Sequence, residues 1–135
     1  GMALAMGPNP NSRYSGMPDD PHGEASKAIS QAVKFIGRAN DSERDFIEAL
    51  FVRFDSETLP DRSERDHAYL EAARELYAKY PNDPDAAALY ADAYMVIGQW
   101  DYWDKEGRPR DGTTEVASAL EDILELRPDH PGHLG

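Results

Sequence analysis

ADAY at residues 91–94 has the same layout as IEAL at residues 47–50 and GMAL at residues 1–4. In each stretch a residue and a spacer come before an alanine, and a large apolar residue follows. Internal repetition of this kind indicates structural units that bury their apolar faces on one another. The sequence therefore predicts a repeat fold.

The segments that follow these three stretches share a second pattern. Apolar residues recur at positions i, i+3, i+4, i+7 and i+8, which places them on one face of a helix. The residues are Ala25, Ala28, Ile29, Ala32 and Val33 in the first segment, Tyr69, Ala72, Ala73, Leu76 and Tyr77 in the second, and Val116, Ala119, Leu120, Ile123 and Leu124 in the third. Each repeat is thus expected to contribute a helix with one buried face.

Glycine and proline residues mark the ends of five predicted helices. We expect these helices at residues 24–37, 42–54, 62–80, 84–98 and 113–127. The alternating polar and apolar runs typical of β-strands are missing from the sequence. The predicted fold is all-α: an α-solenoid of antiparallel helix pairs with long loops inside the repeats, at residues 7–22 and 99–112.

Short polar side chains precede four of the helices and are predicted to cap their first turns. They are Asp41 or Ser42, Ser63 with Asp66 in a capping box, Asp83 before Pro84, and Thr113 or Thr114.

The composition is that of one helical domain with an acidic surface. The 135 residues include 26 acidic and 14 basic ones, which gives a formal net charge of -12, and no cysteine. A negative field of this size repels phosphate backbones and anionic lipids, so we expect no nucleic-acid or membrane partner. Basic or apolar protein surfaces are the natural counterparts. A cytoplasmic location is taken only as the default.

The stretch from Pro81 to Pro128 resembles a tetratricopeptide repeat. Ala91, Tyr94 and Gly98 stand at the small, aromatic and glycine positions of that family's first helix, and LELRPD at residues 124–129 is similar to its usual ending. The two prolines lie 47 residues apart, whereas the family period is about 34 residues. About 13 extra residues must therefore lie between the two helices, in the 99–112 loop.

The resemblance implies how the whole chain is organised. It divides residues 1–135 into a partial repeat at 1–37, a helix pair at 42–80 and a second pair at 84–127. Stretches such as GPNPN at 7–11 look like the middle of larger bacterial tetratricopeptide-repeat proteins, so we expect the chain to be a fragment of a longer array. Apolar faces at the ends of such a segment would favour a homodimer.

The function implied by the resemblance is a non-catalytic scaffold that binds a protein or peptide, with no cofactor. No catalytic constellation or phosphate-binding loop is recognisable in the sequence. The alternative is small-ligand or metal binding at the loop edge formed by residues 7–22 and 99–112.

The candidate binding residues lie in these two loops: Asn9, Asn11, Trp100, Trp103, Arg108 and Arg110. Tryptophan and arginine dominate binding hot spots. The competing interpretation, favoured for Trp100 and left open for Trp103, is that the indoles fold back over the alanine-rich helices. For Arg108 and Arg110 we favour ion pairs with nearby aspartates over ligand binding.

A metal site is not expected, although His130 and His133 are weak candidates. Two histidines on a turn lack the further carboxylate or thiolate ligands that most metal sites use. A solvated turn is the favoured interpretation of this pair.

Overall fold

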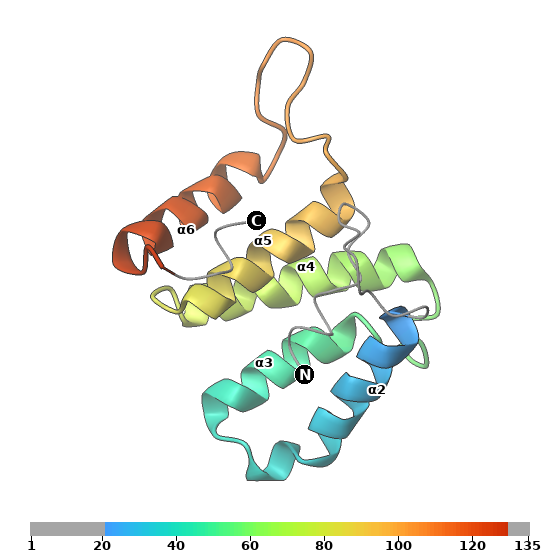
Figure 1. Ribbon diagram of the computed structural model, residues 1–135. Helices are drawn as coiled ribbons and strands as arrows, with labels where there is room; N and C mark the ends of the chain where they lie inside the picture. Colours follow the sequence, from blue (N-terminus) through green and yellow to red (C-terminus); the bar gives the residue numbers. More distant parts are fainter. Residues whose placement is uncertain (1–20, 130–135) are drawn as a thin grey trace.

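The computed structural model describes residues 21–129, and this range contains five α-helices (Figure 1). They are α2 (Pro21–Lys34), α3 (Asp41–Val52), α4 (Arg62–Lys79), α5 (Pro84–Gly98) and α6 (Thr113–Leu126). A short 3-10 helix, η1 (Ile36–Arg38), follows α2. Within the described range there is no strand, only an isolated bridge between Trp103 and Pro109. The predicted all-helical class is confirmed.

The helices pack on one another in the order in which they occur along the chain. α2 contacts α3, α3 contacts α4, α4 contacts α5, and α5 contacts α6. In Figure 1, α2 and α3 lie at one end of the molecule and α6 at the other, and the 99–112 loop projects beyond the helices.

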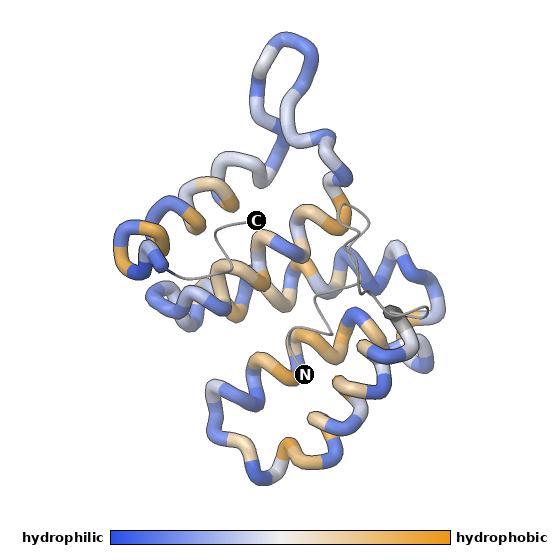
Figure 2. Tube along the Cα trace, viewed as in Figure 1, coloured by the Kyte–Doolittle hydropathy of each residue, from blue (hydrophilic) through white to orange (hydrophobic). Residues whose placement is uncertain are grey.

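Helix α5, which packs between α4 and α6, is buried almost all round. Every residue from Ala86 to Ala93 is buried, and Leu89 is 0% exposed. Alanine side chains let α4 and α6 approach the α5 backbone closely, while full burial of one leucine contributes about 1.5–3 kcal/mol. Figure 2 shows the apolar character of α5 between more polar neighbours. The alanine-rich sequence thus explains why α5 can be covered by helices on both sides.

Helices α2, α4 and α6, which carry the repeated apolar pattern, bury one face each, as their spacing predicts. The first position of the repeated apolar pattern is buried in all three helices, at Ala25, Tyr69 and Val116. The last position is not buried in any of them, and Leu124 is 38% exposed. The apolar face is therefore narrower than the sequence pattern suggests.

Three predicted caps are wrong. Asn40, not Asp41 or Ser42, caps α3: its side chain accepts from the Glu43 amide at 2.9 Å, while the Glu43 carboxylate accepts from the Asn40 amide at 3.0 Å. Asp61, not Ser63, caps α4 by accepting from the Glu64 amide at 3.0 Å. At α5 the predicted cap, Asp83, is confirmed.

At α6 neither threonine is the N-cap, since Gly112 holds that position with no side-chain bond. Thr113 instead donates its hydroxyl to the Tyr102 carbonyl at 2.9 Å.

Helix α2 differs most from its predicted bounds of 24–37. It begins at Pro21 and ends at Lys34, and Gly37 lies inside η1. Proline suits the first turn of a helix, because its missing amide hydrogen would have no intrahelical acceptor there. The other four helices begin and end within two residues of the predicted positions. The predicted partial repeat before residue 21 lies outside the described residues.

Candidate binding site at the 99–112 loop

Hydrogen bonds and a ring contact fix the base of the 99–112 loop to α5 and α6. The Tyr94 hydroxyl, on α5, lies 2.7 Å from Thr113 Oγ1 and 3.0 Å from the Asp111 carbonyl oxygen. The Tyr94 and Tyr102 rings contact each other with centroids 5.8 Å apart. Both ends of the loop are therefore anchored to the same tyrosine.

Two glycines leave room for these rings. A Cβ atom on Gly98 would lie 2.6 Å from Cε1 of Tyr102, and one on Gly112 would lie 2.9 Å from Cε2 of Tyr94. Gly112 also has a φ of +85°, a conformation that L side chains rarely adopt. Larger residues at either position would displace an anchoring ring.

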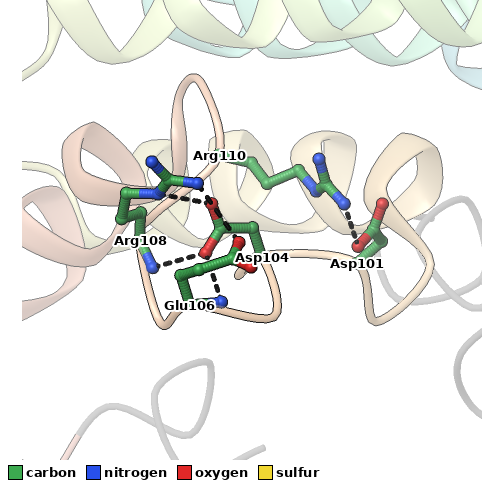
Figure 3. Close-up of polar contacts among 5 residues, drawn as sticks. All are labelled: Asp101, Asp104, Glu106, Arg108 and Arg110. Atoms are coloured by element: carbon green, nitrogen blue, oxygen red, sulfur yellow. Dashed lines mark hydrogen bonds and ion pairs between the residues drawn. The ribbon is translucent and has the colours of Figure 1, made fainter.

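Asp104 organises the outer part of the loop (Figure 3). Its Oδ1 accepts from the amides of Glu106 at 2.9 Å and Arg108 at 2.8 Å, and its Oδ2 accepts from Arg108 Nε at 2.7 Å. These bonds, led by the one from the Arg108 backbone, lower the pKa of Asp104. Arg110 pairs with Asp101 at 2.9 Å. Both arginines thus form the local pairs favoured from the sequence.

The two tryptophans remain in solvent. Trp100 is 74% exposed and Trp103 is 56% exposed. The favoured interpretation that Trp100 folds back over the alanine-rich helices is wrong. Gln99 and Trp100 have φ values of 43° and 73°, so the chain leaves α5 in a left-handed turn. Such a conformation costs an ordinary residue about 1–2 kcal/mol, and here it directs a large apolar side chain outward.

A groove runs beside the loop, made of two adjoining clefts. One, of about 600 Å³, lies among α4, the end of α5 and the loop, with Leu70, Tyr94 and Arg110 in its walls. The other, of about 540 Å³, continues toward the start of α4. His67 and Ile97 line both clefts. Clefts of this size can accommodate a small molecule or part of a peptide.

His67 lies at the junction of the two clefts. Its Nδ1 is 2.7 Å from the Ser63 carbonyl oxygen, which places a proton on Nδ1. An imidazole in this tautomer offers Nε2 as a hydrogen-bond acceptor. Sequence reasoning missed this residue, because a lone exposed histidine on a helix carries no specific signal.

Two polar clusters between helices were also missed. Arg53 Nη1 lies 3.7 Å from Asp92 Oδ2, both side chains are at most 8% exposed, and Tyr69 donates its hydroxyl to the same oxygen at 3.2 Å. Burial, with the nearby Asp92 charge, raises the pKa of Tyr69 well above its ordinary value. A charged residue inside an alanine-rich helix was the available signal for this cluster.

The second cluster joins α3 to the end of α4. Asp45 Oδ2 accepts from the Tyr80 hydroxyl at 2.5 Å and pairs with Lys79. These contacts were not predictable from the sequence, since Asp45 lies among several acidic residues of the same helix.

Asn9, Asn11, His130 and His133 lie outside the described residues. Between residues 21 and 129, no group of three or more histidines and carboxylates is arranged to hold a metal ion. No helix in that range is long and apolar enough to cross a membrane.

Comparisons with protein-family models, curated proteins and solved structures find no match to this chain.

Proposed function

We propose that the protein is a tetratricopeptide-repeat-like scaffold that binds a protein or peptide and is not itself catalytic. Three features support this proposal. Consecutive helices pack in chain order, as stacked helix pairs would. Equivalent positions of the repeated apolar pattern share their burial at Ala25, Tyr69 and Val116. Arg108 and Arg110 hold the loop together by local ion pairs, a structural use of these charges.

The exposure of Trp100 on an anchored loop is the observation that carries the proposal. An indole that is 74% exposed contributes little to the stability of the fold, yet it follows a backbone turn that costs free energy. Exposed aromatic side chains that are already positioned before binding lose little conformational entropy in a complex. We infer that Trp100 and Trp103 contact the partner, with the adjoining groove receiving part of its chain.

Fluorescence tests this directly, because Trp100 and Trp103 are the only two tryptophans in the sequence. Emission of the free protein should be that of water-exposed indole, and binding of a partner should shift it to shorter wavelength. Partners are first selected on the immobilised full chain, and dissociation constants are then measured by calorimetry. A Trp100→Ala/Trp103→Ala variant should weaken binding by about 2 kcal/mol or more, as expected for hot-spot residues.

The matched control is Leu126→Ala, which removes another side chain that is 56% exposed but lies at the end of α6. It should leave the affinity unchanged. Equal binding by the wild type and the double tryptophan variant would disprove the assignment of the loop as the binding surface.

Small-ligand binding in the groove is the second candidate function. The groove favours it by placing Arg110, Tyr94 and His67 around one cleft of about 600 Å³. A ligand there should change the emission of the adjacent loop saturably, and a Leu70→Tyr substitution, which fills the wall without adding a tryptophan, should abolish that change. If no compound in a fragment library alters the melting temperature, this candidate fails.

A further inference from the structure

A second cleft lies at the α2–α3 end of the molecule. It has a volume of about 610 Å³, and its apolar lining includes Ala32 on α2, Phe35 just after that helix, and Phe46 and Ile47 on α3. Phe46 and Ile47 are partly buried and also pack against the core. The cleft shares no lining residue with the groove beside the 99–112 loop.

Phe35 stands at the edge of this cleft and is 54% exposed. The residue directly follows α2, where the chain turns into η1. The Arg38 guanidinium lies over its ring, 5.4 Å from the centroid, and leaves much of the ring in water. A half-exposed phenylalanine beside an apolar hollow can be buried further only by something that enters the hollow.

The charged part of the lining is mainly acidic. Glu43, Asp83 and Asp85 contribute three carboxylates, against one guanidinium from Arg38. The N-termini of α3 and α5 meet at this rim and add about half a positive charge each, which leaves about one net negative charge. The Asn40 and Asp83 caps already accept amide hydrogens of these helix ends. The rim therefore favours a cation over an anion.

We propose that this cleft is a second docking site, whose occupant is a basic, amphipathic peptide segment of another protein. A large apolar side chain of the peptide enters between Phe35, Phe46 and Ile47. Lysine or arginine side chains next to it contact the carboxylates of Glu43, Asp83 and Asp85. The net charge of -12 attracts such a segment from a distance.

The test uses the full chain and a fluorescein-labelled, amidated peptide of about 12 residues, with leucine at i, i+3, i+4 and i+7 and lysine elsewhere. Anisotropy measures its affinity, and amide chemical shifts locate it. Phe35→Ser should weaken binding about tenfold. Glu43→Gln/Asp83→Asn should weaken it about fivefold and reduce its salt dependence, while glutamine and asparagine retain both helix caps.

The matched controls make the same kinds of substitution at positions outside the cleft. Asp61→Asn/Glu64→Gln neutralises the equivalent positions at the start of α4, and Leu126→Ser removes another exposed apolar side chain. Both should bind the peptide like the wild type, and a peptide with glutamate in place of lysine should not bind.

Three results would overturn the proposal. The first is that the cleft variants and the control variants all bind the peptide with equal affinity, and that the peptide changes amide chemical shifts away from the cleft. The second is that the free protein is a dimer and that Phe35→Ser makes it monomeric, which would assign the cleft to a second copy of the chain. The third is that Phe35→Ser changes the amide signals of residues 1–20 in the absence of peptide, which would assign the cleft to the chain's own first residues.

Discussion

Arg53 and Asp92 form an ion pair that connects the end of α3 to the middle of α5. Their side chains are 2% and 8% exposed, so each charge has lost most of its water. Tyr69 on α4 adds a hydrogen bond to Asp92, and the Arg53 guanidinium lies 5.3 Å from the centre of its ring. Three helices thus meet at one polar cluster.

The first prediction concerns this pair. Asp92→Ala should lower the free energy of unfolding by about 3–5 kcal/mol, because a buried guanidinium loses its carboxylate. Urea unfolding followed by circular dichroism measures the change. Arg53→Met/Asp92→Leu should recover much of the loss, since apolar residues of similar volume often replace a buried pair at little cost. A double variant less stable than Asp92→Ala would contradict this account.

Gly98 is the subject of the second prediction. Gly98→Ala should destabilise the protein by about 1–3 kcal/mol through overpacking, because the new Cβ would lie 2.6 Å from the Tyr102 ring. Limited proteolysis should then cleave the 99–112 loop faster. In a Tyr102→Ala background the same substitution should instead be neutral or stabilising, since alanine is the better helix former. Equal effects in both backgrounds would exclude the ring contact as the cause.

For individual residues, the sequence could predict some structural roles and not others. Asp83 was identifiable as a cap because proline follows it, whereas Asn40 and Asp61 stand beside other residues that cap equally well. The pairing of Arg108 and Arg110 was foreseeable from the density of nearby aspartates. The exposure of Trp100 was not, because it depends on positive φ angles that neither Gln99 nor Trp100 prefers.

The contact between α3 and α4 includes the Asp45, Lys79 and Tyr80 cluster. Hydrogen bonds from Lys79 and then Tyr80 lower the pKa of Asp45 below its ordinary value. A carboxyl group whose pKa is lower in the folded state stabilises the fold above its unfolded pKa. That stabilisation is lost as the pH falls through the folded pKa.

The third prediction follows from this loss of stability at low pH. Asp45→Asn should lower the melting temperature near neutral pH and should have little effect below the folded pKa, where the wild type is protonated as well. Hydrogen bonding to Asp45 raises the pKa of Lys79 and of Tyr80, so the same contacts should also weaken as the pH rises through those values. Calorimetric melting across the pH range measures both limits. Glu125→Gln, on the exposed side of α6, is the control and should not change the acid limb.

The fourth prediction concerns the start of α6. Aspartate normally stabilises a helix at its N-cap by about 1 kcal/mol. Gly112→Asp should nonetheless destabilise this protein, because the φ of +85° and the Tyr94 ring both oppose a side chain there. Chemical unfolding measures the free energy of unfolding of this variant, for comparison with Asp83→Ala, which removes a side-chain cap. If Gly112→Asp is stabilising, the Tyr94 contact is not rigid.

Helix bounds were predictable where capping, proline or glycine residues mark the ends of a helix clearly. Residues 84–98 of α5 match the prediction, since Asp83-Pro84 and Gly98 mark its two ends. The end of α2 was not predictable, because the turn into η1 has no proline and Gly37 lies beyond the actual end. The groove was not predictable either, as it combines α4 with a loop distant in sequence.

The whole molecule carries a net charge of -12, and its self-repulsion opposes compactness. The fifth prediction is that sodium chloride stabilises the protein at neutral pH, as the Debye length falls from about 30 Å at 0.01 M to about 8 Å at 0.15 M. Exposed ion pairs weaken in the same range, but each contributes only about 0–1 kcal/mol. The effect should diminish for Glu121→Gln/Glu125→Gln and near the isoelectric point of about 4.6. A melting temperature that falls with salt at neutral pH would show that the ion pairs dominate.

The sequential packing of the helices sets an order for biosynthesis. Helix α5 leaves the ribosome before α6, so one of its apolar sides has no cover until residues 113–126 have emerged. During that interval the nascent chain presents the kind of surface that chaperones recognise. A pause in translation between α5 and α6 would therefore prolong the exposure of this apolar side of α5.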